Sequence, residues 1–276
     1  MVKRILVACI FVPILLIAFL LLPSVATAIV VAFIASAACF ELLRATSKDI
    51  SPIMKWFSVL IAALIPLGDW MVETAGLEVE TTFICAFILM VVLFIVGIRN
   101  HETENEVYFK DITACLFGGV LIPIFLSSLV YLRMMDHGKM WVLLPFVVAF
   151  ICDGGAYFAG VFLGKHRGVT CVSPNKSLEG YIGGLVTCVV ACLVYGLVMQ
   201  YAMGFTVNYV ILAVYGVIGG LMTELGDLAF SLIKRQVGIK DYGKLLPGHG
   251  GMLDRFGSMV FAAPCIFILV HLFPAF

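Results

Sequence analysis

Apolar runs about as long as a membrane is thick follow one another along nearly the whole chain. A helix that crosses a bilayer needs about 20 mostly apolar residues. Nine such runs cover residues 5–22, 25–43, 55–72, 81–98, 112–131, 140–162, 180–202, 207–226 and 257–275. The chain is 63% hydrophobic and 12% charged, whereas soluble domains carry about 25% charged residues. We therefore predict an all-α, polytopic integral membrane protein with about nine transmembrane helices.

The basic residues predict the orientation of these spans. Lys and Arg gather in the cytoplasmic connections of membrane proteins. Fifteen of the 17 Lys and Arg residues lie in the N-terminal segment or in alternate connections that share its side, and only Arg133 and Lys139 fall on the other side. This segregation predicts a cytoplasmic N-terminus. The first run is interpreted as a retained span rather than a signal peptide, because a second apolar run follows it at once.

The polar residues divide the chain into three regions. Residues 1–98 hold apolar helices with bland connections, and residues 99–139 add a polar connection and a middle helix. Residues 140–276 carry two long polar loops, which we expect on the cytoplasmic side. Acidic and basic residues number 17 each, so net charge indicates no class of partner.

Carboxylates at membrane depth are costly and usually mark function. Five of them lie within or at the ends of the predicted spans: Glu41, Asp69, Asp153, Glu224 and Asp227. Glu41 stands near a cytoplasmic end and is interpreted as reaching the interface, and Asp69 is assigned to the opposite interface. The other three adjoin loops rich in Gly, Lys and Arg. We therefore expect functional chemistry at those three.

The first polar loop, residues 153–184, combines many glycines with cations and hydroxyl groups. Glycine lets the backbone approach a ligand closely. Lys176 supplies positive charge beside the neutral polar groups of Ser173, Asn175 and Ser177. This mixture suits a polyphosphate. A basic loop that only fixes topology, with glycines for helix packing, explains the same residues equally well.

The second polar loop, residues 226–255, holds three aspartates, five cations and His249. Its PGHGG turn should expose backbone N–H groups that can cradle an anion. Glu224 and Asp227 are three residues apart and share one helix face. Asp254 begins the last span, where it could meet Asp227. Since Mg²⁺ is commonly bound by one or two carboxylates together with substrate phosphates, we predict a metal-bound phosphate site.

The segment SLIKRQVGIKDYGKLLPGHGGMLDRFGS, residues 231–258, resembles the signature of bacterial phosphatidate cytidylyltransferases, also called CDP-diacylglycerol synthases. The shared pattern is Ser-x-x-Lys-Arg, four residues, Lys-Asp, then Pro-x-His-Gly-Gly-x-x-Asp-Arg. The stretches DGGAYFAG and SPNKSLEG resemble two further motifs of the family. The resemblance covers residues 150–260 and is much weaker before them. The family usually has a second Asp where this chain has Gly257.

The resemblance implies a reaction, its partners and a location. A cytidylyl group would pass from CTP to phosphatidic acid, which gives CDP-diacylglycerol and pyrophosphate. Residues 140–276 would form the catalytic region, on the cytoplasmic side of a bacterial inner membrane. The implied partners are CTP, phosphatidic acid and membrane lipid, and no nucleic acid is expected.

Roles for individual residues follow from matching the family motifs. Asp227 and Asp254 would bind Mg²⁺, with Glu224 and Asp241 as weaker candidates. Phosphate groups of either substrate would be bound by Lys234, Arg235, Lys240 and Arg255. His249 would either donate to the leaving pyrophosphate or shape its turn. Contacts to the nucleotide are expected from Ser173, Asn175, Lys176 and Ser177.

Other functions remain open at this point. A CTP-dependent enzyme acting on another lipid acceptor would need the same cytoplasmic motif. A lipid transporter would explain polar groups beside Gly-rich helices but predicts inverted repeats, and the sequence shows no repeat. An inactive scaffold is a further alternative because of Gly257. Small residues in 213–226 permit close helix packing within or between subunits, so a homodimer is also compatible with the sequence.

Overall fold

A computed structural model describes residues 13–47, 50–103, 106–245, 248 and 250–276. Helices account for every regular element in these ranges. Their contacts divide the chain into two compact units, residues 1–136 with 237–256 and residues 137–236 with 257–276. The boundaries predicted from polarity, 1–98, 99–139 and 140–276, stay a prediction.

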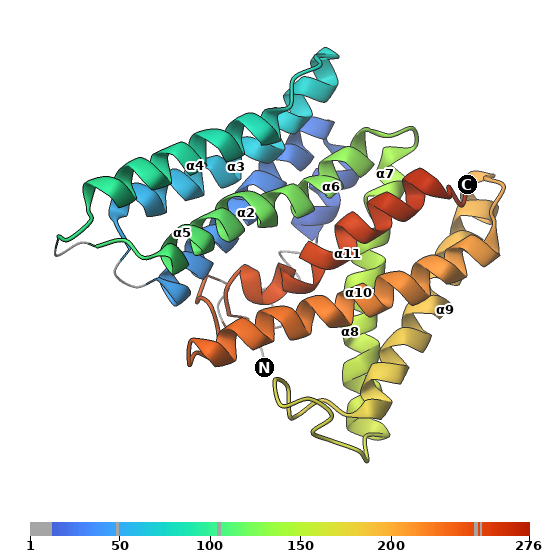
Figure 1. Cartoon of the computed structure of the whole chain (residues 1–276). Helices are drawn as coiled ribbons and strands as arrows, with labels where there is room; N and C mark the ends of the chain where they lie inside the picture. The colour runs from blue at the N-terminus through green and yellow to red at the C-terminus, as the bar shows by residue number, and fades with distance from the viewer. Residues whose placement is uncertain (1–12, 48–49, 104–105, 246–247, 249) are drawn as a thin grey trace. The chain divides into compact units, whose positions relative to one another are not determined.

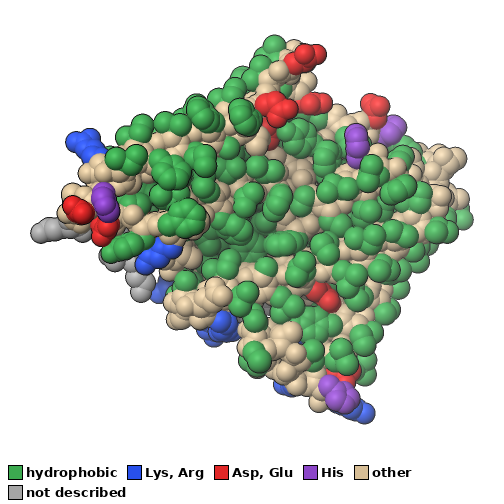
Figure 2. Space-filling view, in the orientation of Figure 1, with side chains coloured by type: hydrophobic (Ala, Val, Ile, Leu, Met, Phe, Trp, Pro, Cys, Tyr) green, Lys and Arg blue, Asp and Glu red, His purple; other side chains and the backbone are tan. Residues whose placement is uncertain are grey.

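Eight helices in the described ranges are long and apolar enough to cross a membrane. They confirm the predicted all-α class with multiple spans. Residues 5–12 of the first predicted span lie outside the described ranges, so the count of nine stays a prediction. Hydrophobic side chains cover most of the face drawn in Figure 2. On one helix the large apolar side chains of Phe83, Phe87 and Ile98 are 67%, 60% and 76% exposed, as expected for a surface that faces lipid.

The first unit is built mainly from the N-terminal helices. In chain order they are η1 (Ile17–Leu21), α2 (Ser24–Thr46), α3 (Pro52–Ala75), α4 (Thr81–Arg99), α5 (Phe109–Leu116), η2 (Phe117–Leu121) and α6 (Ile122–Met134). Pro52 starts α3, where its missing N–H costs nothing. Gly76 ends the same helix in a left-handed conformation, φ 62°. α5, η2 and α6 form one span, Phe109–Met134, with a π turn in its middle.

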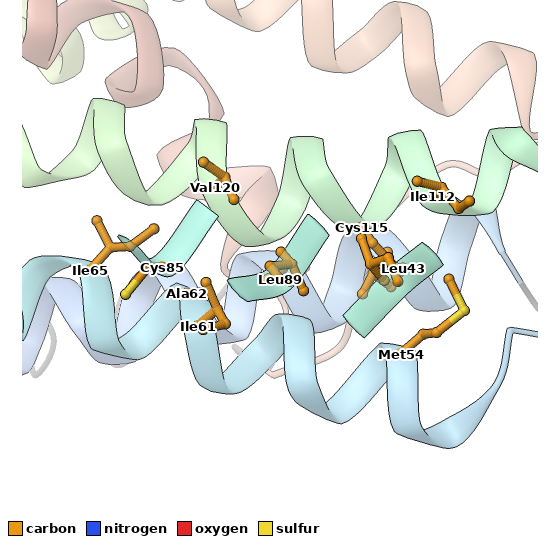
Figure 3. Close-up of a cluster of buried hydrophobic side chains, with 12 residues drawn as sticks. Leu43, Met54, Ile61, Ala62, Ile65, Cys85, Leu89, Ile112, Cys115 and Val120 are labelled. Atoms are coloured by element: carbon orange, nitrogen blue, oxygen red, sulfur yellow. The ribbon is translucent and has the colours of Figure 1, made fainter. Parts of the chain in front are cut away.

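The core of the first unit lies between α2, α3, α4 and α5 (Figure 3). Leu43, Met54, Leu89 and Cys115 are fully buried within it. Each comes from a different one of these helices, which leave their other faces for lipid or for further helices. This cluster fixes the neighbours of α2, the helix that carries Glu41.

The second unit consists of the C-terminal helices. They are α7 (Gly138–Trp141), α8 (Leu144–Phe162), α9 (Leu178–Met203), α10 (Tyr209–Gln236) and the part of α11 (Leu253–Leu272) that follows Phe256. The predicted end of the eighth span at residue 226 is wrong, because α10 continues to Gln236. Residues 227–236 are mostly good helix formers, so the change from apolar to charged side chains does not end the helix.

Small residues let α8, α9 and α10 approach one another closely (Figure 1). A Cβ on Gly155 would overlap Thr187, and one on Gly183 would overlap Ala159. A Cβ on Gly216 of α10 would lie 2.6 Å from the Cα of Val189 in α9. Because that neighbour is backbone, it cannot move aside alone. These glycines therefore set the spacing of the helices that carry the candidate site.

Gly216→Ala should destabilise the second unit by about 1–3 kcal/mol, the usual cost of overpacking a core. The midpoint of thermal unfolding in detergent measures this loss. Gly97→Ala in α4 is the matched control, because its nearest neighbour would be an Ile112 methyl at 3.8 Å. A midpoint for Gly216→Ala equal to that of Gly97→Ala would contradict the close α9–α10 packing.

Candidate active site

The loop between α8 and α9, residues 163–177, is closed at its base by the first turn of α9. The Glu179 carboxylate accepts hydrogen bonds from the backbone N–H groups of Lys165 at 3.1 Å and His166 at 3.2 Å. The His166 ring Nδ1 lies 2.6 Å from the same carboxylate. Leu178 N–H donates to the His166 carbonyl at 3.0 Å. Glu179 therefore holds the start of the loop against the first turn of α9, where the loop ends.

Three of the predicted nucleotide contacts lie on this loop in different settings. Ser177 is buried and starts α9, where its hydroxyl oxygen accepts the Gly180 N–H at 3.1 Å. Ser173 lies in a turn, with its N–H donated to the Thr170 hydroxyl at 3.3 Å. Asn175 is exposed. The helix cap accounts for a hydroxyl at residue 177 independently of any ligand, and nucleotide contact by these residues stays a prediction.

Lys176, the fourth of these residues, forms an ion pair with α10. Its Nζ lies 2.6 Å from Asp227 Oδ2, with both side chains partly exposed. Burial lowers the pKa of Lys176, but attraction by Asp227 and Asp153 outweighs it, so the pKa lies above its ordinary value. Lys176 is therefore a permanent cation at neutral pH.

Glu224, one helical turn before Asp227, is the most buried acid of this group. It is 8% exposed, and its Oε1 has no hydrogen-bond partner in the described ranges. Asp153, Lys176 and Asp227 are all close enough to act on it electrostatically. Three carboxylates and one ammonium thus share one region of the second unit. Because the carboxylates outnumber the ammonium, this group can attract a further cation.

Arg235 provides a second link between the loop and α10. Its Nε donates to the Val172 carbonyl at 3.2 Å. Asp227 and Arg235 are eight residues apart and lie on similar sides of α10, and each holds one point of the loop. Lys234 is half-buried beside Arg235. The structure therefore brings three predicted site residues, Lys176, Asp227 and Arg235, to the contact between this loop and α10.

The remaining predicted residues belong to the first unit, around residues 237–252 and the start of α11. Asp254 Oδ2 accepts the backbone N–H groups of Tyr242 at 2.8 Å and Gly251 at 2.9 Å. Lys240, Asp241 and Arg255 are exposed. His249 lies outside the described residues. Asp227 and Asp254 fall in different units, so their pairing stays a prediction.

Two residues that contact this segment were missed or misread in the sequence. Glu41 was interpreted as reaching the interface, but it is 4% exposed and accepts the Leu253 N–H at 2.9 Å. Arg44, one turn later on α2, donates to the Tyr242 carbonyl at 3.0 Å. Asp69 is also buried and accepts a hydrogen bond from Thr82, and its placement at the opposite interface stays a prediction. Glu41 and Asp69 could have been singled out from the sequence, because a carboxylate within an apolar span is costly unless it has a partner.

Comparison with known proteins gives the family. A family described as "Cytidylyltransferase family" matches residues 2–273. This chain belongs to that family. Among its relatives, one from Staphylococcus haemolyticus is 32% identical over 83% of this chain and 84% of its own length. One from Staphylococcus aureus strain COL is 35% identical over 66% and 68%, and one from Staphylococcus saprophyticus is 32% identical over 79% and 81%. All three are named phosphatidate cytidylyltransferase.

The donor set of this cytidylyltransferase suits a hard divalent cation only in part. In the described ranges, no three His, Cys, Asp or Glu side chains gather closely enough to hold a metal ion by themselves. Mg²⁺ often takes only one or two carboxylates and completes its shell with water and substrate phosphates. Asp227 and the unpartnered oxygen of Glu224 fit that mode. Asp227 and Glu224 are therefore the acids of the second unit that would hold such a cation together with water and phosphate.

Gly257 of this cytidylyltransferase, the departure from the family pattern, has a packing explanation. It is buried, and a Cβ there would lie 2.9 Å from Cδ2 of Phe230 in α10. A side chain at residue 257 would therefore meet the Phe230 ring. An aspartate at this position would require that ring to move or a smaller residue at 230.

Gly257→Asp should therefore lower stability and not raise activity. Overpacking costs about 1–3 kcal/mol, and burying a carboxylate beside a phenyl ring adds to that cost. Phe230→Ala in the same chain would make room, so the double variant should recover part of the unfolding midpoint. An increase in cytidylyl transfer by Gly257→Asp alone, without loss of stability, would show that Phe230 does not exclude the aspartate.

Proposed function

We propose that this chain is a phosphatidate cytidylyltransferase that converts CTP and phosphatidic acid into CDP-diacylglycerol and pyrophosphate. Membership of the family and the names of the relatives support the activity. The observation that carries it is the contact of Lys176 with Asp227 at 2.6 Å. This pair joins a cationic Gly-rich loop to a carboxylate helix, and nucleotide transfer needs both kinds of group.

Charge repulsion is the main obstacle in this reaction. A phosphatidate oxygen attacks the α-phosphorus of CTP in line, and the bond from that phosphorus to the pyrophosphate oxygen breaks. The phosphate monoester is already ionised near neutral pH, so no strong general base is required. Both reactants are anionic, and cationic side chains that hold them in line lower the barrier.

The residues of this chain divide that task. Lys176 and Arg235 hold the 163–177 loop against α10 and present positive charge to the nucleotide phosphates. Lys234, Lys240 and Arg255 supply further phosphate contacts. Ser173, Asn175 and Ser177 contact the nucleotide. Asp227 and Asp254 would hold Mg²⁺, with Glu224 and Asp241 as additional ligands, and a bound Mg²⁺ supplies charge neutralisation at the phosphates.

The site is proposed to face the cytoplasm across a bacterial inner membrane. The segregation of Lys and Arg supports this orientation, because both polar loops lie on the basic side. CTP then arrives from the cytoplasm and phosphatidate from the adjacent leaflet. A homodimer remains part of the proposal, but Gly216, Gly219 and Gly220 of α10 already pack against helices of the same chain and would not form its interface. The mass of the purified protein in detergent tests the oligomeric state.

Lipid labelling tests the activity directly. Purified protein in detergent is given phosphatidate, CTP labelled with ³²P at the α-phosphate, and Mg²⁺, and lipid-extractable label is followed. An isoprenoid alcohol and an ether lipid serve as alternative acceptors in parallel. Label in phosphatidate that depends on Mg²⁺ is the expected result. Label confined to another acceptor would reassign the substrate, and none from folded protein with any acceptor would overturn the enzyme assignment.

A further inference from the structure

Glu41 of α2 is buried beneath the segment that carries most of the signature motif. Its side chain is 4% exposed and accepts the Leu253 N–H at 2.9 Å, across a sequence separation of 212 residues. The backbone of Met252 also hydrogen-bonds to this carboxylate. Leu253 is the first residue of α11. Because the first N–H groups of a helix have no partner within it, Glu41 acts as a cap supplied from another helix.

Two glycines of the loop leave the space that the Glu41 carboxylate occupies. A Cβ on Gly243 or on Gly251 would overlap the Glu41 carboxyl group. The two glycines also pack against each other, since a Cβ on Gly243 would lie 3.0 Å from the Cα of Gly251. The described arms of this loop, residues 237–245 and 250–252, therefore meet directly over Glu41 at these two glycines. Any larger residue at either position would displace the carboxylate or separate the arms.

The contacts of Glu41 with Leu253 and with the two glycines also set the orientation of the Asp254 side chain. Asp254 follows the capped Leu253, and its Oδ2 accepts N–H groups from Tyr242 and Gly251, one in each arm of the loop. Arg44 holds the first arm through the Tyr242 carbonyl at 3.0 Å. Glu41 and Arg44 are three residues apart on one face of α2. One face of α2 thus supports both the loop and the acid that the proposed function assigns to the metal.

We propose that Glu41 is a positioning residue for cytidylyl transfer. It holds residues 242–243, residues 251–252 and the first turn of α11 so that Asp254 keeps its orientation. It touches neither substrate and acts through the backbone. This role rests on the proposed function for its catalytic consequence. The structural part, an acidic support beneath the loop, does not depend on what the protein catalyses.

Hydrogen exchange gives a readout that needs no turnover. Glu41→Met keeps the length of the side chain but removes the acceptor, and Glu41→Gln keeps an oxygen acceptor. We expect amides in residues 242–254 to exchange faster in Glu41→Met and to stay near wild type in Glu41→Gln. Ile65→Ala is the matched control, because Ile65 is fully buried in the hydrophobic cluster that joins α2, α3, α4 and α5, and no residue of this loop belongs to the described part of that cluster. Equal exchange in Glu41→Met and wild type would overturn the proposal, as would the same increase in Ile65→Ala.

Kinetics then test the catalytic consequence. Loss of an outer-shell partner of a metal ligand commonly costs about 10- to 100-fold in activity. We expect kcat to fall by this factor in Glu41→Met at saturating CTP, to recover in Glu41→Gln, and to be unchanged in Ile65→Ala. A normal kcat with faster exchange would overturn the positioning role. If wild type transfers no label, the proposed function fails, and the exchange result still decides whether Glu41 supports the loop.

A double variant covers the case in which Glu41→Met does not fold. Gly251→Ala forces a methyl group into the Glu41 carboxylate, and Glu41→Ala removes that carboxylate. If both act at one contact, Glu41→Ala with Gly251→Ala should exchange no faster at residues 242–254 than Gly251→Ala alone. Independent, additive increases would show that the two residues do not meet, and the proposal would be wrong.

Discussion

Asp227→Asn is expected to lower the rate of cytidylyl transfer by about 100- to 1,000-fold, the usual effect of removing one preorganised electrostatic group from an active site. Asparagine keeps the shape of the side chain but not its charge. The charged carboxylate pairs with Lys176 at 2.6 Å and, in the proposed site, would offer an oxygen ligand to Mg²⁺. The initial rate of transfer of α-labelled CTP to lipid measures the loss, at several Mg²⁺ concentrations.

The Mg²⁺ concentration for half-maximal rate should rise in this variant, since one hard ligand has been weakened. Glu73→Gln is a matched control: Glu73 is an exposed acid near the end of α3, so the same net charge is lost far from the second unit's cluster in sequence. A wild-type rate and an unchanged Mg²⁺ requirement in Asp227→Asn would exclude Asp227 from the site.

Lys176→Met is expected to reduce the rate by about 100-fold for a different reason. The ammonium is the cation that Asp227, Asp153 and Glu224 share, and in the proposed function it would present charge to the nucleotide. Because its pKa is raised above 10.5, its ion pair is fully formed at neutral pH and is lost only as pH rises through the raised value. Activity near pH 7 should therefore show no titration of this residue.

The Mg²⁺ requirement separates the roles of these two residues. Removing Lys176 leaves the carboxylates without their fixed cation, so the half-maximal Mg²⁺ concentration should fall in Lys176→Met while it rises in Asp227→Asn. Lys176→Arg retains the charge and should restore part of the rate, although the planar guanidinium cannot reproduce the short Nζ contact. A higher Mg²⁺ requirement in Lys176→Met would mean that Lys176 does not compete with the cation for Asp227.

Composition and local patterns were sufficient for the class of protein and for its family. Runs of about 20 apolar residues demand lipid as solvent, and the structure has eight described helices of that kind. The Ser231–Ser258 segment carries enough fixed positions to indicate a cytidylyltransferase, and the family match confirms it. A short-range feature was missed, since Ser177 was assigned only to nucleotide contact although it caps α9.

Helix ends were harder to predict where polarity changes inside a helix. Residues 227–236 lie beyond the apolar part of α10, and hydropathy alone assigned them to a loop. They remain helical because most of them are good helix formers even in water. This extension places Asp227 and Arg235 on a rigid element, which fixes their distance along the site.

The sequence by itself determined that the protein lies in a membrane, that it is helical and which segments form its polar loops. Each of these properties depends on residues that are close together in the chain. Only the tertiary structure decided that Lys176 pairs with Asp227, that Phe230 fills the space at Gly257, and that Glu41 caps α11. Those contacts join residues from about 27 to more than 200 positions apart. A single sequence contains no signal for such pairs, since they depend on how the helices pack rather than on the residues beside them.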